Sequence, residues 1–284
     1  MEGKIDSVKF GKTEQIVSVV GLGGEGILRT QGHEREARGV IREAIRQGIT
    51  YFDSARVYAG SESYYGSIWP ENPDVRSGIF QTSKSARRDK RGALSDLETT
   101  LRTMGVDHLD LWQVHDVRTE GDFEAISGPG GALDGFVAAK KAGKVRFIGI
   151  TGHHDPSVLT RAVREWPIDS VLLPVNPVEA VLGGFLDGTL VEARKKGIAV
   201  IGMKVLGAGH YVLPDLDINP ELLIRFALSQ EITLAIVGCS TPEEVQTLAG
   251  VGRNFKPLST KEQDEVIGKF RPYAARLAYY RGTL

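Results

Sequence analysis

The sequence has a single cysteine, Cys239, and lacks an excess of one charge, a long apolar run and a linker-like segment. One cysteine cannot form a disulfide within the chain. The 35 basic and 36 acidic residues give a formal net charge of −1, so no strong field attracts nucleic acid or an anionic membrane. No stretch is long and apolar enough to span a bilayer, and no cleavable signal is evident. These absences predict a cytoplasmic protein with a small-molecule partner, and they favour no particular oligomeric state.

The domain organisation follows from length and from the same absences. A chain of 284 residues can hold two domains, but barrels often use this length as one. The sequence shows no Pro- or Ser-rich linker and no repeat of fixed period. We therefore predict a single domain over residues 1–284, with extra C-terminal helices over residues 262–270 and 274–280.

Short β-branched runs alternate with amphipathic stretches along the chain. The predicted strands cover residues 16–21, 50–53, 79–83, 109–115, 145–150, 170–173, 199–203 and 234–237. The predicted helices between them cover residues 34–47, 90–104, 133–142, 156–166, 190–196, 220–229 and 242–250. Asp155, Asn219 and Thr241 each precede a proline and are expected to cap a helix start. Glycine follows several helix ends, at Gly48, Gly105, Gly143 and Gly197, where a left-handed residue ends a helix.

The order of these elements predicts the fold class. Strand, helix and strand joined by short connections require parallel pairing through right-handed crossovers. Eight such strands in 284 residues favour closure into a (β/α)8 TIM-type barrel. Residues 8–13 predict a small N-terminal β-hairpin that caps one end of it. An open doubly wound sheet is the alternative.

A glycine-rich segment, residues 21–26, follows the first predicted strand and matches G-x-G-x-x-G. In dinucleotide-binding folds the last glycine of this motif opens a helix directly. Here residues 27–32 intervene, and Asp53 lies about 27 residues after Gly26 instead of about 20. We interpret the segment as a turn at the rim of the first strand, where Gly23 and Gly24 still approach a cofactor. A Rossmann site is the less favoured alternative.

Four polar residues stand at the ends of three consecutive predicted strands. Asp53 and Tyr58 follow the second strand, Lys84 follows the third, and His115 ends the fourth. The carboxyl ends of the strands in a parallel barrel meet at one mouth, where the catalytic residues of such enzymes lie. Taken alone, each residue is more often a cap, a solvated lysine or a core histidine. Together they predict one site.

The four side chains suit a proton transfer. A tyrosine with a pKa near ~10 is a weak acid at neutral pH, and a nearby ammonium such as Lys84 stabilises its phenolate. Asp53 would hold Lys84 charged and in place. His115 would donate a hydrogen bond to a substrate carbonyl. Such a site protonates an oxygen while another group attacks the carbon.

These residues resemble the aldo-keto reductase family, and the similarity extends along most of the chain. Residues 51–62 resemble the family's Asp-Thr-Ala, Tyr-Gly and Ser-Glu signature, and residues 80–84 and 109–115 resemble the strands that carry its lysine and histidine. Residues 10–13 and 19–23 resemble its opening hairpin and first strand. The resemblance implies hydride transfer between a nicotinamide dinucleotide and an aldehyde, ketone, sugar or alcohol. Tyr58 is then the general acid and base, assisted by Lys84, Asp53 and His115.

The resemblance also implies a set of cofactor-binding residues. They are Gly23, Gly24, Asp53, Thr151, Gly152, Asn176, Met203, Leu206, Gly207, Gly238, Ser240, Thr241 and Glu244. Three segments near the nicotinamide depart from the family pattern. Thr151-Gly152 stands in place of Ser-Asn, Asn176-Pro177 in place of Asn-Gln, and Met203 in place of an aromatic ring that stacks on the nicotinamide.

The loop after the last predicted strand bears on the choice of cofactor. Ser240 and Thr241 at a helix start suit a phosphate. Glu244 stands where many members carry an arginine against the 2′-phosphate of NADP, and a carboxylate there repels that phosphate. The sequence therefore predicts NADP(H) as the family default, with NAD(H) as the alternative.

Substrate contacts and competing functions complete the prediction. Glu25, Val57, Ser85, Asp116 and His153 are candidates for the substrate pocket by position alone. No metal site is predicted, because the adjacent histidines at residues 153 and 154 point apart and have no third ligand at suitable spacing. Two alternative functions remain: a non-catalytic regulatory barrel that binds a dinucleotide, and a lyase or isomerase that uses Lys84 as an amine nucleophile.

Overall fold

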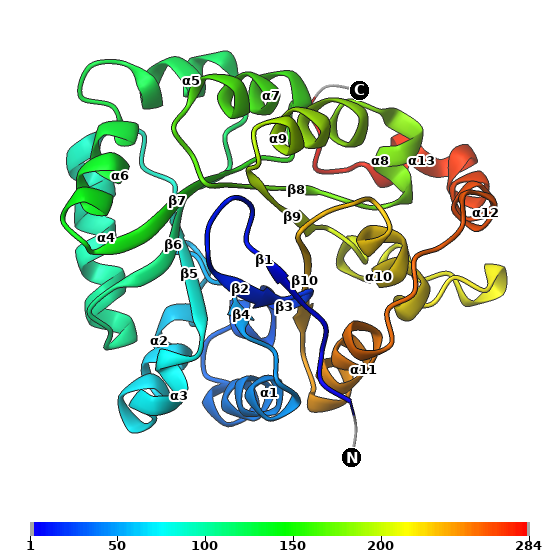
Figure 1. Ribbon diagram of the computed structural model, residues 1–284, viewed down its shortest axis with the longest axis horizontal. Helices are drawn as coiled ribbons and strands as arrows, with labels where there is room; N and C mark the ends of the chain where they lie inside the picture. The colour runs from blue at the N-terminus through cyan, green and yellow to red at the C-terminus, as the bar shows by residue number, and fades with distance from the viewer. Residues whose placement is uncertain (1–2, 283–284) are drawn as a thin grey trace.

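A closed barrel of eight parallel strands forms the centre of the computed structural model, which describes residues 3–282 (Figure 1). The strands in barrel order are β3 (Val20–Gly26), β4 (Tyr51–Phe52), β5 (Phe80–Ser85), β6 (Leu109–Val114), β7 (Val145–Thr151), β8 (Ser170–Pro174), β9 (Ala199–Met203) and β10 (Leu234–Cys239). β10 pairs with both β9 and β3, which closes the ring. The predicted (β/α)8 barrel is confirmed, and the open sheet is wrong.

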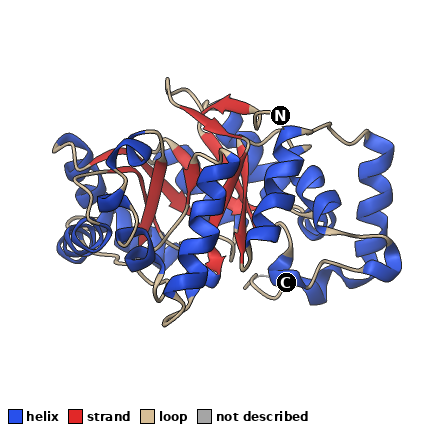
Figure 2. Cartoon of the chain, turned by 90° about the horizontal axis from the view of Figure 1, so that it is seen from below, coloured by secondary structure: helices blue, strands red, loops and turns tan. Residues whose placement is uncertain are grey.

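An antiparallel hairpin of β1 (Ser7–Lys9) and β2 (Ile16–Ser18) precedes the barrel. The single strand predicted over residues 16–21 is wrong, because the chain turns between β2 and β3. The Ser18 hydroxyl holds this turn by donating to the Val20 carbonyl at 2.7 Å and accepting from the Thr50 amide at 3.0 Å. Phe10 beyond β1 packs on Phe80 at the start of β5, with ring centroids 4.7 Å apart. The hairpin therefore caps the amino ends of the strands, as predicted (Figure 2).

Helices surround the barrel and connect its strands. They are α1 (Glu34–Gln47), α2 (Ser61–Gly66), α3 (Pro73–Ser77), α4 (Lys90–Met104), α5 (Glu120–Ser127), α6 (Ala132–Lys141), α7 (Pro156–Glu165), α8 (Pro177–Leu182), α9 (Leu190–Lys195), α10 (Pro220–Leu228), α11 (Pro242–Arg253), α12 (Thr260–Phe270) and α13 (Ala274–Leu277). Short helical turns are η1 (Ile27–Arg29), η2 (Trp69–Glu71), η3 (Phe185–Thr189), η4 (Gly207–Gly209), η5 (Pro214–Leu216) and η6 (Arg271–Tyr273). Between residues 3 and 282, no helix has the length and apolar character needed to cross a membrane.

The predicted helix ends are confirmed by their local geometry. The side chains of Asp155, Asn219 and Thr241 accept backbone hydrogen bonds at the starts of α7, α10 and α11. Gly48 and Gly105 end α1 and α4 with φ of 86° and 65°, in the left-handed region that favours glycine. The helices α2, α3, α5 and α8 were not predicted, because they are too short to show a helical period.

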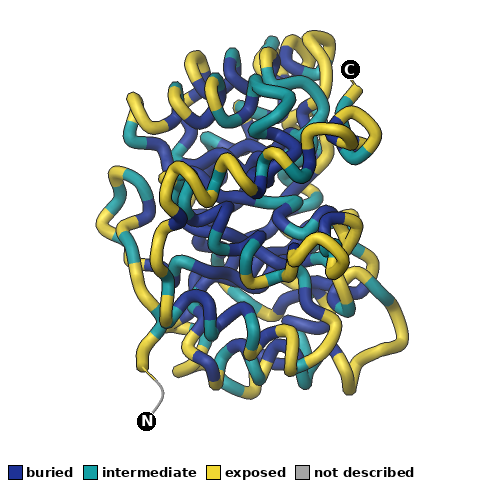
Figure 3. The backbone as a smooth tube through the Cα atoms, turned by 90° about the vertical axis from the view of Figure 1, so that its right-hand side faces the viewer, coloured by how far each residue is buried: buried dark blue, intermediate teal, exposed yellow. Residues whose placement is uncertain are grey.

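The hydrophobic core has two parts. A small cluster, including Phe10, Tyr51, Phe80 and Leu111, fills the barrel near the hairpin. A larger one lies between the strands and the surrounding helices. Figure 3 shows buried residues through the middle of the molecule and exposed residues along its outer helices and loops. Because the hairpin covers the amino ends of the strands, the carboxyl ends are the mouth that remains for a site.

Candidate active site

The four polar residues predicted to share a site meet at the carboxyl ends of β4, β5 and β6. The Lys84 Nζ donates to Asp53 Oδ2 at 2.6 Å. It also lies 4.7 Å from the centre of the Tyr58 ring. The His115 ring meets the Tyr58 ring edge-on, with centroids 5.6 Å apart and an interplanar angle of 83°. The structure therefore brings together the four side chains that the strand order placed at one mouth.

Lys84 and Asp53 form a buried ion pair, with side chains only 1% and 2% exposed. Burial lowers the pKa of Lys84, and the Asp53 charge opposes that effect. Asp53 also accepts from the Thr82 hydroxyl at 2.9 Å, which fixes the carboxylate. The ammonium donates a second hydrogen bond to the Ser54 carbonyl at 2.8 Å. An ammonium has three protons, so the contacts within residues 3–282 leave one for an acceptor beside Tyr58.

The hydroxyl of Tyr58 keeps its proton at neutral pH. Burial raises the pKa of Tyr58 well above its ordinary value, and the negative charges of Asp53 and Glu25 add to this. Burial therefore outweighs the effect of neighbouring positive charge on the pKa of Tyr58. Arg29 opposes the rise from 5.0 Å above the Tyr58 ring, where a 2.6 Å ion pair with Glu25 holds it. Arg29 was not predicted as a site residue, because its only signal in the sequence is its spacing from Glu25.

His115 is a neutral imidazole in this site. Burial, followed by the Lys84 charge, lowers the pKa of His115 to about 3. A neutral ring carries one proton, which suits the predicted donation to a carbonyl oxygen. Arg88 fixes the turn after β6, since its guanidinium donates to the carbonyls of His115 and Asp116 at 2.8 and 2.7 Å. Arg88 was not predicted as a site residue either.

The glycines of β3 allow close packing and do not form a Rossmann loop. A Cβ on Gly23 would lie 2.8 Å from the Gly238 amide of β10, and one on Gly238 would lie 2.7 Å from the Glu25 backbone. A Cβ on Gly24 would lie 2.8 Å from two atoms of the Tyr58 ring. The turn η1, and not a full helix, follows β3. The Rossmann alternative therefore has no support, and Gly24 leaves the space that Tyr58 occupies.

Substitution of Gly24 by alanine is expected to displace the Tyr58 ring. The added methyl would overlap that ring, and a shift of about 1 Å in a reacting group can cost 10²-fold in rate. We expect kcat for Gly24→Ala to fall by about tenfold or more in a steady-state turnover assay. The matched control is Gly39→Ala in α1, where an added Cβ meets nothing within 4 Å. Equal rates for the two variants would contradict this role of Gly24.

The residues predicted to bind the nicotinamide end differ in whether their hydrogen-bond donors are free for a ligand. The Thr151 hydroxyl accepts from the Asp116 amide at 2.9 Å and keeps its own proton. Asn176 is fully buried, and its amide donates to the Lys204 carbonyl and the Tyr280 hydroxyl, each at 3.1 Å. Both amide protons of Asn176 are thus bonded within the chain. Asn176 therefore has a structural role in this arrangement.

The remaining cofactor candidates lie on three further segments. Gly152 follows β7, and Met203 ends β9 with its side chain partly buried at the edge of the barrel core. Leu206 and Gly207 lie at η4, where Gly207 has a φ of 54° and packs under the Tyr211 ring. These candidates therefore lie at or just after the carboxyl ends of β7 and β9, at the same end of the barrel as Tyr58.

The residues predicted to bind a phosphate lie at the start of α11. Ser240 and Thr241 are exposed there, at the positive end of a 12-residue helix. The Glu244 carboxylate folds back on the same turn and accepts from the Ser240 amide at 2.5 Å. A negative charge therefore already lies at this helix start.

The chain is a closed parallel barrel with a buried lysine–aspartate pair, a tyrosine and a histidine at its carboxyl mouth. This combination of fold and site indicates the class of protein to which the chain belongs. Residues 19–214 match the model of the Aldo/keto reductase family. The chain belongs to this family and is an oxidoreductase.

Known proteins resemble the chain over most of its length. The L-galactose dehydrogenase of Arabidopsis thaliana is 29% identical over 287 residues, which cover 86% of each chain. The aldo-keto reductase str7 of Strobilurus tenacellus is 27% identical over 226 residues, which are 73% of this chain and 65% of that protein. The solved structure of an aldo-keto reductase from Klebsiella pneumoniae in complex with NADPH has a TM-score of 0.74 at 20% identity and covers 95% of this chain and 96% of its own. That structure supports the barrel fold.

Proposed function

We propose that this chain is an NAD(P)H-dependent carbonyl reductase, or an alcohol or sugar dehydrogenase when the same reaction runs in reverse. The observation that carries the proposal is the position of Lys84. Its ammonium pairs with Asp53 at 2.6 Å and lies 4.7 Å from the Tyr58 ring. This is the arrangement needed to stabilise a tyrosinate as the phenol gives up its proton. The whole chain acts as one catalytic domain.

Each residue of the site has one task. The reduced dinucleotide, when bound, supplies a hydride to the carbonyl carbon. His115 donates a hydrogen bond to the carbonyl oxygen and orients it. Tyr58 transfers its proton to that oxygen, Lys84 stabilises the resulting phenolate, and Asp53 keeps Lys84 charged. In the reverse direction the Tyr58 oxygen accepts the alcohol proton.

The mouth fits an extended dinucleotide at its phosphate end. The exposed hydroxyls of Ser240 and Thr241 stand at the positive end of α11 and can donate to a phosphate, although the Ser240 amide is already bonded to the Glu244 carboxylate. At the other end the Thr151 hydroxyl has a proton to donate, and the Met203 thioether can pack on a ring. Asn176 does not fit the role of an amide donor, because its protons are already bonded.

The carboxylate of Glu244 is expected to favour NADH over NADPH. It lies at the start of α11, where a 2′-phosphate would add negative charge beside it. Neutralising it with Glu244→Gln is expected to improve the affinity for NADPH relative to NADH by about fivefold, the effect of roughly 1 kcal/mol at an exposed site. Fluorescence titration with both cofactors measures this ratio.

Glu243→Gln is the matched control for this substitution. Glu243 is exposed in the same first turn and has the same charge. An unchanged NADPH to NADH ratio in Glu244→Gln, or an equal change in both variants, would contradict the assignment.

A cofactor titration followed by an aldehyde panel tests the proposed function. We expect quenching of protein fluorescence by NADPH or NADH, and oxidation of the bound cofactor when an aldehyde is added. Binding without reduction across the panel would favour a regulatory barrel. Binding of neither cofactor, together with borohydride trapping of a substrate on Lys84, would favour a lyase or isomerase. The buried ion pair with Asp53 argues against that last reading, because it keeps Lys84 protonated and non-nucleophilic.

A further inference from the structure

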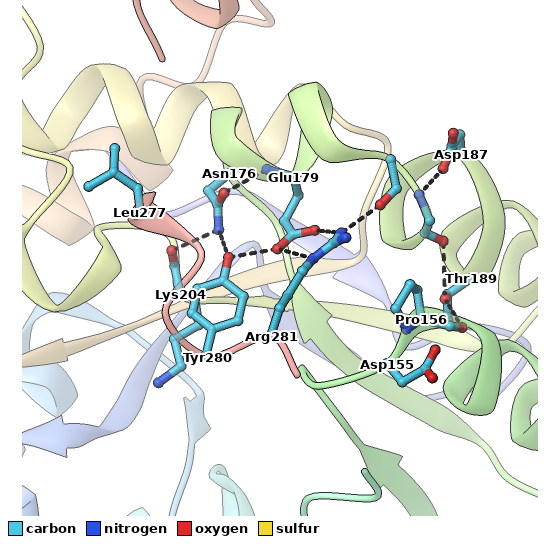
Figure 4. Close-up of polar contacts among 12 residues, drawn as sticks. Asp155, Pro156, Asn176, Glu179, Asp187, Thr189, Lys204, Leu277, Tyr280 and Arg281 are labelled. Carbon is cyan, nitrogen blue, oxygen red and sulfur yellow. Dashed lines mark hydrogen bonds and ion pairs between the residues drawn. The ribbon is translucent and has the colours of Figure 1, made fainter. Parts of the chain in front are cut away.

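The C-terminal segment, residues 277–282, is attached to the start of α8 by buried polar side chains. The Tyr280 hydroxyl donates to the Glu179 carboxylate at 2.7 Å and accepts from the Asn176 amide at 3.1 Å. Arg281 pairs with Glu179, and the two side chains are 5% and 0% exposed. Figure 4 shows Tyr280 and Arg281 converging on Glu179 and Asn176. The Glu179 charge is compensated by these partners only while the segment is docked, so docking is favoured.

Tyr280 also connects the loops that follow three neighbouring strands. Its carbonyl oxygen lies 3.3 Å from Nδ1 of His153, two residues after β7, and its ring meets the His153 ring edge-on with centroids 5.7 Å apart. Its hydroxyl binds Asn176, two residues after β8. The second amide proton of Asn176 bonds to the carbonyl of Lys204, directly after β9, at 3.1 Å. One residue therefore joins the loops after β7, β8 and β9, directly or through Asn176.

The ends of the C-terminal segment make two further contacts with these loops. The Tyr211 hydroxyl, beyond β9, donates to the Leu277 carbonyl at 3.1 Å. The Tyr211 ring in turn packs on Gly207, where an added Cβ would lie 2.6 Å from it. The Gly282 amide donates to the carbonyl of His154, in the loop after β7, at 3.2 Å. The segment is thus fixed to the mouth on both sides of Tyr280.

The three loops include the residues proposed for the nicotinamide end of the cofactor, which are Thr151, Gly152, Met203, Leu206 and Gly207. The Thr151 hydroxyl also accepts from the amide of Asp116, next to His115. A ligand that binds loops already held in one arrangement does not pay for ordering them, so such loops bind more tightly than mobile ones. Contacts that fix these loops therefore act on cofactor affinity without touching the cofactor.

We propose that Tyr280 is a positioning residue for the nicotinamide half of the cofactor site. With the C-terminal segment docked, the loops after β7, β8 and β9 keep the arrangement to which a dinucleotide binds. Coupling between two binding events is reciprocal, so the bound dinucleotide also stabilises the docked segment. This inference rests on the proposed binding of NADPH or NADH.

The Tyr280→Phe variant tests this role. It removes one hydroxyl, leaves Asn176 and Glu179 each without that partner, and keeps a ring against His153. We expect the Kd for NADPH and for NADH, measured by fluorescence titration, to rise at least fivefold. We expect kcat at saturating dinucleotide to change by less than about twofold, because the contacts of Tyr58 are not altered.

Tyr64→Phe is the matched control. Tyr64 is buried in α2, after β4 and across the barrel from β8. Its hydroxyl also makes two hydrogen bonds, to the Thr30 carbonyl at 3.0 Å and from the His33 amide at 3.2 Å. We expect this variant to lose stability to chemical denaturation as Tyr280→Phe does, but to bind both dinucleotides as the wild type does. Wild-type affinity in Tyr280→Phe, or equal weakening in both variants, overturns the positioning role.

Hydrogen exchange measures the reciprocal effect on the C-terminal segment. The Arg281 and Gly282 amides bond to the carbonyls of Ala278 and His154, so their exchange rates report docking. We expect saturating NADPH or NADH to slow this exchange at least threefold in the wild type. Unchanged exchange in a wild-type protein that binds dinucleotide overturns this inference alone. A wild-type protein that binds neither dinucleotide overturns the proposed function, and this inference with it.

Discussion

The Tyr58→Phe variant is expected to lose at least 10³-fold in kcat for carbonyl reduction while it binds the dinucleotide with unchanged affinity. A phenyl ring keeps the packing over Lys84 and against His115 but has no proton to give. General acid catalysis contributes about 10²–10⁴-fold, and no other hydroxyl is assigned to this task. Stopped-flow or steady-state absorbance at the reduced nicotinamide band measures turnover, and fluorescence titration measures binding.

Tyr273→Phe is the matched control, because Tyr273 is exposed on η6 and outside the site. It is expected to keep the wild-type rate. Full activity in Tyr58→Phe would remove the tyrosine from the mechanism. A parallel loss of cofactor binding in that variant would instead indicate that the ring holds the dinucleotide.

The Lys84→Met variant is expected to lose both activity and stability. The substitution removes the ammonium but leaves the Asp53 carboxylate buried, with the Thr82 hydroxyl as its remaining side-chain donor. Breaking a buried ion pair from one side costs about 3–5 kcal/mol, because an uncompensated charge stays in the interior. Chemical denaturation measures the free energy of unfolding, and the rate assay measures turnover.

A double variant separates the two losses. In Lys84→Met with Asp53→Asn no charge is left to bury, so we expect the free energy of unfolding to recover by at least half of the loss. Turnover is expected to stay as low as in Lys84→Met, since the phenolate still has no cation beside it. Recovery of activity together with stability would contradict a catalytic role for Lys84.

The barrel could be predicted because its signals are local. The order of strands and helices determines parallel pairing, and residues such as Asp155, Thr241 and Gly105 mark helix ends by chemistry that acts within a few positions. The four strand-end residues could be brought to one mouth by topology alone. Their separation in sequence did not matter, since parallel strands place their carboxyl ends together.

The contacts of the C-terminal segment, residues 277–282, with Asn176 and Glu179 could not be predicted, because they join segments that lie far apart in the sequence (Figure 4). The Tyr280 hydroxyl bonds to Asn176, which is 104 positions away. This contact uses the amide that the family resemblance assigned to a cofactor. The predicted helix over residues 274–280 also ends at Leu277, since the chain beyond α13 extends toward Glu179. Neither feature has a periodic signal in the sequence.

The protonation states of the site residues could not be predicted from the sequence either. The sign of the Tyr58 pKa shift depends on how far burial outweighs nearby positive charge, and burial is a property of the packed mouth. The same holds for His115, whose pKa falls mainly through burial. The identities of these residues predicted the chemistry, but their neighbours determine the charge that each one carries.

Transfer of deuterium from the cofactor is the most direct test of the central claim. The protein is incubated with a reduced nicotinamide dinucleotide that carries deuterium at both C4 positions and with glyceraldehyde, and the alcohol product is analysed by mass spectrometry. We expect one deuterium on the former carbonyl carbon with wild-type protein and at least 10³-fold less product with Tyr58→Phe. An alcohol without deuterium, or deuterated product formed equally fast by the variant, would contradict hydride transfer assisted by Tyr58.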